Sequence, residues 1–578
     1  MLLKSIVKII LWRKKMIKNK IFKKLILTGL STMLISGSTA WAQTAPSTVT
    51  PGQIVKEPVK QRLEPIKAAP LIEAPEDRSE VGGSQKEIFV LNDIQFEGLS
   101  AYSKEDLHSI YANFLNKKVS LADLRKIVRD VTVKFRNDGF VLSRAALAQQ
   151  KIKDGIVHIR IVEGFISDVK VVGDYKDRAD LINRYAKKIL KQKPVNTKDL
   201  ERYLLLMDDL PGISARSILK ASSSTPNGSD LIVTIDQDNA EASVGVDNFG
   251  SKPLGRYQLT AVVAANSLMG RHDRTTLRGI ITSDTEELRF GDITHEQQVG
   301  SEGLRIKGRA AFTGTKPGDT VAALNLKGDS EFYALDFLYP VLRSRQKNFN
   351  VLGAFQALNS QSDLSGIEIS EDKVRSVSLG GSFDFTDSYA SVNQIDFGVT
   401  QGLDIFGATD DGLGRTRSNG EHTFTRFNLQ ATRIQDLWWS QWSVYAAAKG
   451  QYALDALLAS EEFGVGGRAF GRAYDGAEIL GDHGAAGALE LRYSRNAQSD
   501  LLKSYQAYAF YDVGAVWNKD RVVGEERRDS LASAGLGTRF NLNHDISGLA
   551  EFSVPLTRDV ATEGNNDKRF FFSLLKRF

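Results

Sequence analysis

Residues 506–517 read QAYAFYDVGAVW, and in this stretch polarity alternates from one residue to the next. The second phase is mixed and contains Gln506, Asp512 and Gly514. The first phase holds only apolar side chains: Ala507, Ala509, Tyr511, Val513, Ala515 and Trp517. Because successive side chains of a strand point to opposite faces, the pattern predicts a strand with one apolar and one polar face.

The same alternation recurs across residues 239–578, where helical periodicity is absent. In residues 427–431 and 442–451 one phase is again apolar and the other mixed or polar, and the polar loops 410–412 and 564–567 separate such segments. All four tryptophans that follow the N-terminal leader lie in this region: Trp438, Trp439, Trp442 and Trp517. Alternating strands with interfacial aromatic residues are typical of an outer-membrane β-barrel.

The predicted fold class of residues 239–578 is therefore a membrane all-β barrel of antiparallel strands. A tilted spanning strand needs about 9–11 residues, so the region can supply between about 12 and 18 strands, and the pattern alone leaves the number open. A large soluble β-sandwich also alternates and is the rival interpretation. The uninterrupted β region, an export leader and an aromatic final strand favour the barrel.

Residues 1–42 are predicted to be a signal peptide. Six lysines between residues 14 and 24 precede the apolar run 25–35, and Ala40-Trp41-Ala42 offers a cleavage site. Met16 is an alternative initiator. The other interpretation is an uncleaved anchor, but the run is shorter than the roughly 20 residues that span a bilayer as a helix.

Charge and composition exclude several function classes. The leader carries nine lysines and arginines and no acidic residue, so without it the formal charge falls from +5 to −4. That balance argues against a nucleic-acid partner. The absence of cysteine rules out thiolate metal sites and a cysteine nucleophile. We find no Gly-x-Ser-x-Gly, Walker or His-Glu-x-x-His motif and no ligand-like histidine spacing, so we expect no cofactor, no metal and no enzyme. A protease or lipase site assembled from distant loops is the alternative.

Between the leader and the barrel the chain has two parts. Residues 43–85 contain six prolines among charged and small residues, which predicts a linker, and within it residues 52–67 could form a short helix that docks as a plug. Residues 86–238 repeat one order of elements twice, which predicts two small α+β modules, 86–164 and 165–238.

Each module is predicted as strand, helix, helix, strand, strand. In the first, strand 88–98 precedes a helix capped by Ser103 with Asp106, a helix that begins near Leu121, and strands 141–152 and 156–162. In the second, strand 166–172 precedes helices 178–191 and 197–207 and strands 213–220 and 231–235.

These parts resemble a known family. The two modules are similar to POTRA domains, and the motif residues 471–475 (GRAYD), 510–514 (FYDVG), 338–345 (LYPVLRSR) and the final Phe578 are similar to those of the Omp85 superfamily. Within it the chain resembles the two-partner secretion transporters, which export haemolysins, filamentous adhesins and contact-dependent inhibition toxins. The resemblance implies a barrel of 16 antiparallel strands, a plug helix in its pore, and export without a nucleotide or an ion gradient.

The resemblance also implies an internal latch, comprising Arg472, Tyr474, Asp475, Asp512 and Gly514. Asp512 falls on the predicted lumen phase of its strand, where an infolded loop could bring the Arg472 guanidinium to it. Residues 467–470 (GRAF) offer a second register through Arg468, and we prefer Arg472 because Asp475 and a glycine follow it. The family has glycine where this chain has Ala473, which puts the tightness of the loop in question. The alternative is that Arg472 is a solvated loop charge and Asp512 an ordinary lumen residue.

Two further sets of site residues are predicted. Phe572, Leu574 and Phe578 form an assembly signal by the resemblance, and a purely lipid-facing role is the plainer interpretation. The second strand of each module is predicted to be an exposed edge at which an unfolded client adds as a strand. The candidate residues there are Arg144, Leu147, Gln149, Arg216, Ile218 and Lys220, and the alternative is that these strands are ordinary sheet.

The sequence thus predicts an outer-membrane transporter whose POTRA-like modules recognise an unfolded exoprotein in the periplasm. Expected partners are that exoprotein, outer-membrane lipid, the barrel assembly machinery and periplasmic chaperones, with no nucleic acid. The alternatives are an outer-membrane insertase of the same superfamily, whose members typically carry more POTRA units, and a general porin, which needs no periplasmic modules.

Overall fold

The computed structural model describes residues 51–56, 86–389, 391–409, 414–438, 441–497, 499–520 and 526–578. The predicted signal peptide 1–42 and most of the predicted linker lie outside the described residues. In the part of the chain that is described, no helix combines the length and hydropathy that a membrane crossing requires.

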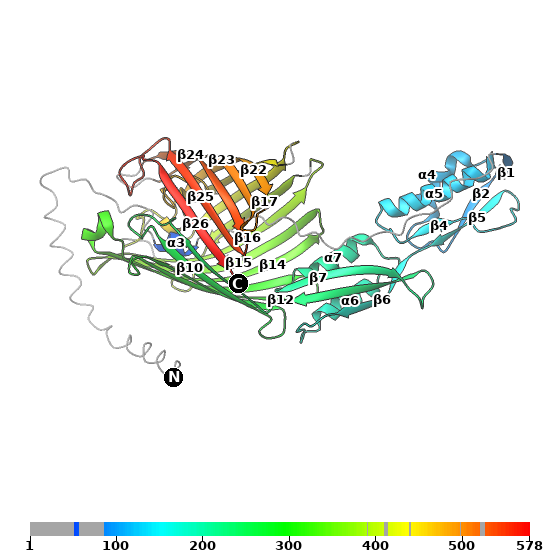
Figure 1. Ribbon diagram of the computed structural model, residues 1–578, viewed down its shortest axis with the longest axis horizontal. Coiled ribbons are helices and arrows are strands. Elements are labelled where there is room, and N and C mark those ends of the chain that lie inside the picture. Colours follow the sequence, from blue (N-terminus) through cyan, green and yellow to red (C-terminus); the bar gives the residue numbers. More distant parts are fainter. Residues whose placement is uncertain are drawn as a thin grey trace. The chain divides into compact units, whose positions relative to one another are not determined.

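Residues 240–577 form a closed barrel of 16 antiparallel strands, as the resemblance implied (Figure 1). The strands are β9 (Ala240–Asp247), β10 (Gln258–Asn266), β11 (Asp273–Thr282), β12 (Leu288–Val299), β13 (Leu304–Thr315), β14 (Leu326–Arg343), β15 (Lys347–Leu364), β16 (Ile367–Thr386), β17 (Val392–Gly402), β18 (Thr425–Asp436), β19 (Trp442–Ala453), β22 (His483–Asn496), β23 (Leu502–Trp517), β24 (Arg528–Leu542), β25 (Ile546–Pro555) and β26 (Arg569–Arg577). Closure pairs every strand on both sides, which satisfies the backbone hydrogen bonds that a bilayer cannot.

The alternation found in the sequence sets the two faces of the barrel wall. On β23 the side chains of Tyr508, Phe510 and Asp512 are buried toward the lumen, whereas Tyr511 and Val513 are 48% and 45% exposed on the outer face. The predicted phase is correct, and it places the Asp512 carboxylate inside the barrel.

The barrel closes where β26 meets β9, in a register that runs from Ser573 opposite Asp247 to Arg577 opposite Ser243. Beyond the end of β9, the side-chain amide of Asn248 continues this ladder. Its Nδ2 donates to the Phe570 carbonyl at 2.8 Å, and its Oδ1 accepts from the Phe572 N–H at 2.7 Å. One amide side chain therefore takes the place of a further strand residue.

The first module contains β1 (Glu87–Leu91), β2 (Asp93–Glu97), α4 (Lys104–Tyr111), β3 (Lys117–Ser120), α5 (Leu121–Asn137), β4 (Arg144–Ala146) and β5 (Ile156–Val162). Its sheet has the order β2-β5-β4, with β2 and β5 parallel. Ser103 with Asp106 forms the predicted capping box of α4, and Ser120 with Asp123 forms another at α5.

Two predictions for this module were wrong in detail. The strand expected over 88–98 breaks at Asn92, because its first half pairs with β3, a strand that the sequence pattern did not reveal. The strand expected over 141–152 shrinks to the three residues of β4. After β4 the Gln150 side chain takes the ladder position, since it accepts from the His158 N–H at 2.8 Å and donates to the His158 carbonyl at 2.7 Å.

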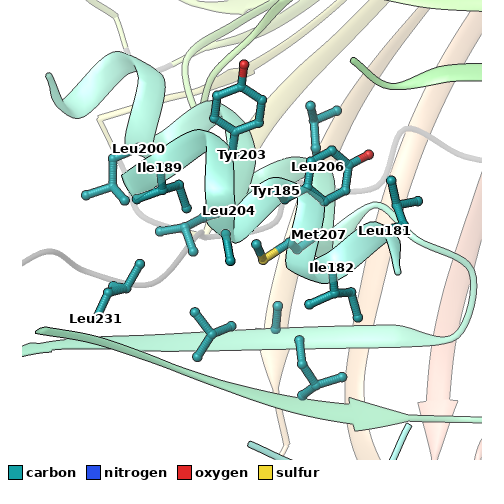
Figure 2. Close-up of a cluster of buried hydrophobic side chains, with 14 of the residues drawn as sticks. Leu181, Ile182, Tyr185, Ile189, Leu200, Tyr203, Leu204, Leu206, Met207 and Leu231 are labelled. Atoms are coloured by element: carbon teal, nitrogen blue, oxygen red, sulfur yellow. The ribbon is translucent and has the colours of Figure 1, made fainter. Parts of the chain in front are cut away.

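The second module contains β6 (Phe165–Val172), α6 (Leu181–Leu190), α7 (Thr197–Asp208), β7 (Ile213–Ala221) and β8 (Gly228–Gln237), with the sheet order β6-β8-β7. Helix α6 begins three residues later than predicted, because Asp177 accepts from the Leu181 and Ile182 N–H groups at 2.9 and 2.8 Å. The two helices cover one face of the sheet. Figure 2 shows their buried side chains, among them Leu181, Tyr185 and Met207, above the strand that carries Leu231. Each such fully buried aliphatic side chain contributes about 1.5–3 kcal/mol.

The second module is fastened to the strand connections at the adjacent rim of the barrel. Arg343, within the predicted motif 338–345, forms two parallel hydrogen bonds of 2.7 Å to the Asp209 carboxylate. The buried Tyr185 hydroxyl accepts from the Gln298 side chain at 3.0 Å, and the His272 imidazole lies 3.1 Å from Asp177. The motif recognised in the sequence therefore serves to hold a module to the barrel.

Candidate functional site

Inside the described part of the barrel, two elements that do not belong to the wall bear on the predicted site. One is the lumenal hairpin, residues 463–481, in the connection between β19 and β22; it comprises β20 (Phe463–Val465), β21 (Ile479–Gly481) and the turn between them. The other is helix α3 (Pro51–Lys56). Both obstruct the space that the strands enclose.

Apolar packing holds the lumenal hairpin against the wall. Val465, Tyr474 and Ile479 are buried in one cluster with Val516 of β23 and Leu531 of β24. Gly514 is required for this contact, because a Cβ added to it would lie 2.5 Å from Val465 Cγ1. The predicted latch residue Gly514 thus provides a gap in the wall for β20.

The turn of the lumenal hairpin is tight without a glycine at position 473. Gly466, Gly467 and Gly471 adopt positive φ, and at Gly471 (φ +94°) a Cβ would lie 2.7 Å from Leu531 Cδ1. Ala473 is not among the positive-φ residues, and its carbonyl accepts from the Arg569 guanidinium at 2.9 Å. The sharp backbone bend lies at Gly471, so an alanine fits at position 473, two residues later.

Arg472 and Asp512 form the centre of the site. The Arg472 Nε and Nη2 groups donate to the two oxygens of Asp512 at 2.9 and 2.7 Å. The backbone N–H groups of Gly471 and Arg472 donate to the same carboxylate at 3.2 and 3.0 Å. Arg472 is 4% exposed and Asp512 is fully buried. A charge in such a place is costly without its partner, so the loop and the wall depend on each other.

Glu490 of β22, which sequence reasoning missed, extends this ion pair into a network. Its carboxylate accepts hydrogen bonds from Arg472 Nη1, from Arg492 Nε at 2.6 Å, and from Arg539 Nη1 and Nη2 at 3.0 and 2.9 Å. The Arg472 guanidinium also lies 3.7 Å from the centroid of the Phe510 ring. Glu490 and Arg492 are two residues apart on β22 and therefore point to the same face of the strand. Two opposite charges at this spacing are the sequence pattern that could have revealed them.

Tyr474 and Asp475 do not contact Asp512. The Tyr474 hydroxyl donates toward the carbonyls of Ala532 and Arg558, both at 3.3 Å. Asp475 accepts from Arg569 at 2.7 Å and from the Thr562 hydroxyl. These two predicted latch residues attach the far side of the turn to β24, β26 and the connection between β25 and β26.

Arg468, the alternative register, has a site of its own. It donates to Glu551 of β25 at 2.7 Å, and the Tyr508 hydroxyl donates to the other oxygen of Glu551 at 2.6 Å. Its guanidinium lies 4.5 and 5.1 Å from the ring centroids of Phe249 and Phe571. The structure therefore uses both arginines of the repeated motif, and pairs Arg472 rather than Arg468 with Asp512.

Helix α3 rests on β13, β14, β15 and the short turn 459–461 that precedes the lumenal hairpin. The Gln53 side chain donates to the carbonyls of Ala459 and Glu462 at 2.6 and 3.4 Å. Ile54 packs against a cluster of leucines at one end of the lumen: Leu254, Leu288, Leu326 and Leu364. The helix of the predicted linker begins at Pro51, and its described part ends at Lys56.

A further part of the barrel interior is lined by both charged and apolar residues. A cavity of about 580 Å³ borders wall strands from β12 to β19, and its lining includes Glu296, Arg305, Lys307, Asp336 and Lys449. No group of three His, Asp or Glu side chains in the described ranges could hold a metal ion.

The two predicted client edges differ. In the first module, the Ala145 N–H of β4 points outward and donates to the Thr132 hydroxyl of α5 at 3.0 Å, so α5 covers this short edge. Arg144 is exposed, and Leu147 and Gln149 lie beyond the end of β4. Neither residue extends a strand onto which a client could add.

In the second module, β7 is nine residues long and forms an edge of its sheet. Only its beginning is covered, because the Ala215 N–H donates to Asp208 at 2.9 Å. Arg216 forms an ion pair with Asp236, Ile218 is 61% exposed, and Lys220 is exposed. The edge beyond residue 216 is the more accessible of the two.

The predicted assembly-signal residues lie on the final strand and at its end. Leu574 and Phe578 are 43% and 75% exposed on the outer face, and the Phe572 ring lies 6.3 Å from that of Tyr257. Their outward direction fits contact with lipid and leaves a role in assembly as a prediction.

Comparison with known proteins places the chain among secretion proteins. Residues 227–540 match the family described as haemolysin secretion/activation protein ShlB/FhaC/HecB, and residues 89–164 match the ShlB-type POTRA domain. The heme/hemopexin transporter protein HuxB of Haemophilus influenzae strain 86-028NP is 22% identical over 489 residues, which cover 82% of this chain and 84% of HuxB. The outer membrane transporter CdiB of Escherichia coli O6:K15:H31 strain 536 is 23% identical over 464 residues, which cover 76% of this chain and 75% of CdiB.

Solved structures show the same architecture. CdiB from Escherichia coli aligns with a TM-score of 0.72 at 20% identity, covering 89% of this chain and 94% of that one. CdiB from Acinetobacter baumannii aligns with a TM-score of 0.64 at 18% identity, covering 88% and 94%. At this level of identity the likeness shows the fold.

Proposed function

Because this chain belongs to the family of haemolysin secretion/activation proteins of the ShlB/FhaC/HecB type, we propose that it exports a partner exoprotein through the lumen of its barrel. The barrel lies in the outer membrane and the two modules lie in the periplasm. The observation that carries the proposal is the seat of α3. In the described part of this helix, the attachments to the barrel are the Gln53 side chain and the apolar contact of Ile54, and a short helix attached in this way inside the lumen is an obstruction that can leave.

The client is an unfolded exoprotein of the haemolysin, adhesin or contact-dependent inhibition class, and β7 is its first docking site. An extended segment can add to β7 beyond residue 216 through backbone hydrogen bonds, since a side chain covers only the Ala215 N–H. The corresponding edge of the first module is three residues long and covered by α5. Capture therefore occurs on the module that is fastened to the barrel by Arg343 and Asp209.

Once captured, the client enters the lumen after α3 leaves, while the Arg472 network keeps the lumenal hairpin against β22, β23 and β24. The chain needs no catalytic site for this task and works without nucleotide hydrolysis. Folding of the client outside the cell gives direction, because burial of its apolar surface is favourable and return would require unfolding.

Deletion of the gene tests this proposal. We expect the large exoprotein encoded nearby to stay in the periplasm of the deletion strain and to reach the medium again when the full chain is restored. Normal export without this chain would exclude the proposal. Loss of unrelated barrels from the outer membrane of the same strain would indicate an insertase instead.

A further inference from the structure

The β10–β11 connection, residues 267–272, carries an exposed apolar tip. Leu268 and Met269 are 66% and 54% exposed, although the rest of the turn is tightly held. The fully buried Asp273 accepts from the Met269 N–H at 3.0 Å and from the Arg271 N–H at 3.4 Å, and His272 is fully buried beside Asp177. Two large apolar side chains that are exposed on such a turn indicate a surface that contacts another molecule or a membrane.

Three cations surround this tip. The turn touches the second module directly, since the Arg178 N–H donates to the Gly270 carbonyl at 2.7 Å and the Ser267 hydroxyl donates to the Lys176 carbonyl at 3.4 Å. Lys176, Arg178 and Arg271 are exposed, and none of the three forms an ion pair with a residue in the described ranges. By contrast, Lys188, Arg202 and Arg343 at the same rim are all paired with carboxylates.

The nearby carboxylates do not neutralise these cations. Asp177 faces His272, Asp273 faces the backbone of its own turn, and Asp180 lies 3.8 Å from Lys187. Asp174 is the exposed acidic residue of the segment that contains Lys176. The exposed charges around the apolar tip are therefore three cations and one carboxylate, because Asp177 and Asp273 are turned inward. We call this surface the rim patch: Lys176, Arg178, Leu268, Met269 and Arg271.

The rim patch lies at the end of the wall strands β10 and β11. Directly beyond it along β10 and β11, the outward side chains of Val263 and Leu277 are 52% and 54% exposed on the lipid-facing wall. Apolar side chains next to lysine and arginine at this depth match the acyl and headgroup layers of a phospholipid. A free phosphate would satisfy the cations alone and leave Leu268 and Met269 in water.

We propose that the rim patch binds an anionic phospholipid of the periplasmic leaflet, with its phosphate among Lys176, Arg178 and Arg271 and its acyl chains against Leu268 and Met269. Such a lipid would hold the second module at the membrane surface, independently of whether the barrel exports a client. Phosphatidylglycerol serves as the probe.

The sequence contains no cysteine, so one introduced cysteine can carry a single fluorescent label. The full-length variant Met269→Cys, labelled with bimane, is placed in phosphatidylcholine nanodiscs that contain a small share of nitroxide-labelled phosphatidylglycerol or phosphatidylcholine. We expect at least about twofold stronger quenching by the anionic lipid. Equal quenching by both lipids, or no quenching, would overturn the proposal.

Charge variants then locate the selectivity. In the same background, Lys176→Gln with Arg271→Gln should abolish the preference for phosphatidylglycerol, and neither side chain is buried, so folding is preserved. Lys151→Gln with Lys153→Gln, two exposed lysines of the first module, should retain it. A preference that survives the first pair would contradict the proposal. Loss of the preference on addition of inorganic phosphate would assign the patch to a free anion instead.

Discussion

Arg472 and Asp512 meet through two parallel hydrogen bonds of 2.9 and 2.7 Å inside the barrel, where both side chains are almost completely shielded from solvent. One belongs to the lumenal hairpin and the other to the wall, so this pair is the joint between an inserted loop and the barrel. Arg472 also reaches Glu490, which itself holds Arg492 and Arg539.

Removing one member of the central pair should weaken the barrel strongly. We expect Arg472→Ala or Asp512→Ala to lower the free energy of unfolding by about 3–5 kcal/mol. The first leaves the buried Asp512 carboxylate without its guanidinium, and the second leaves Arg472 with Glu490 as its remaining carboxylate. The double variant should cost no more than the worse single one. Urea unfolding in detergent measures this. Arg495→Ala, at an exposed arginine, is the control. Additive losses would show that the two residues act separately.

The gap at Gly514 should be essential for the seat of the lumenal hairpin. Gly514→Ala brings a Cβ to 2.5 Å from Val465 Cγ1, so we expect the hairpin to shift and the folded barrel to lose its resistance to heat in SDS. Val465→Ala in the same chain should restore part of it. Gly308→Ala, where a Cβ meets nothing within 4 Å, should leave the barrel unchanged. A harmless Gly514→Ala would contradict this account of the contact.

Loss of the Gln53 side chain should release α3. Gln53→Ala removes the hydrogen bonds to the carbonyls of Ala459 and Glu462, each worth about 1 kcal/mol net. Together they amount to about 2 kcal/mol, a factor of about 30 in an equilibrium constant, so we expect the open fraction of the channel in planar bilayers to rise up to about thirtyfold. Gln95→Ala, at an exposed position of the first module, should conduct as the parent chain does.

Blocking the edge of β7 should impair capture of the client. Because the Ala215 N–H points away from β8, the Ser217 N–H points the same way, and Ser217→Pro removes it from a position where an edge strand tolerates proline. We expect secretion of the exoprotein to fall severalfold with normal amounts of barrel in the membrane. Ser217→Ala keeps the N–H and should secrete normally. Equal secretion by the two variants would move the docking site elsewhere.

The capping box of α5 predicts a response to acid. The Ser120 backbone N–H and its hydroxyl donate to Asp123 and hold the pKa of this carboxyl below its usual range. Its stabilising effect is therefore present above the ordinary aspartate pKa and is lost as the pH falls through the lowered value. At neutral pH, Asp123→Asn should speed hydrogen exchange in the first turn of α5. The difference from the parent chain should disappear in strong acid, and a difference that persists there would refute the assignment.

Features that depend on neighbouring residues could be predicted from the sequence, whereas contacts between distant residues could not. The two faces of β23 and the capping box at Ser103 are local patterns, so they could be read directly. Glu490 and Arg539 lie 49 positions apart and meet only because of the register of β22, β23 and β24. A strand can slide by two residues without exchanging its faces, so alternation does not fix that register.

Other misses have the same origin. β3 was not predicted because it is short and pairs with β1 rather than with the main sheet, and β4 ends early because the Gln150 side chain replaces its backbone. The strand number and the latch came from the resemblance, not from periodicity. The network around Glu490, by contrast, left a trace in the alternate charges at positions 490 and 492.

The attachment of Gln53 has a consequence for how such a protein can diverge. Its two acceptors are main-chain oxygens at positions 459 and 462, and every amino acid supplies one. Replacement of the residues there would change the character of the loop and still present the same acceptors to the helix. Helix α3 can thus keep this attachment to the barrel while the side chains at positions 459 and 462 change.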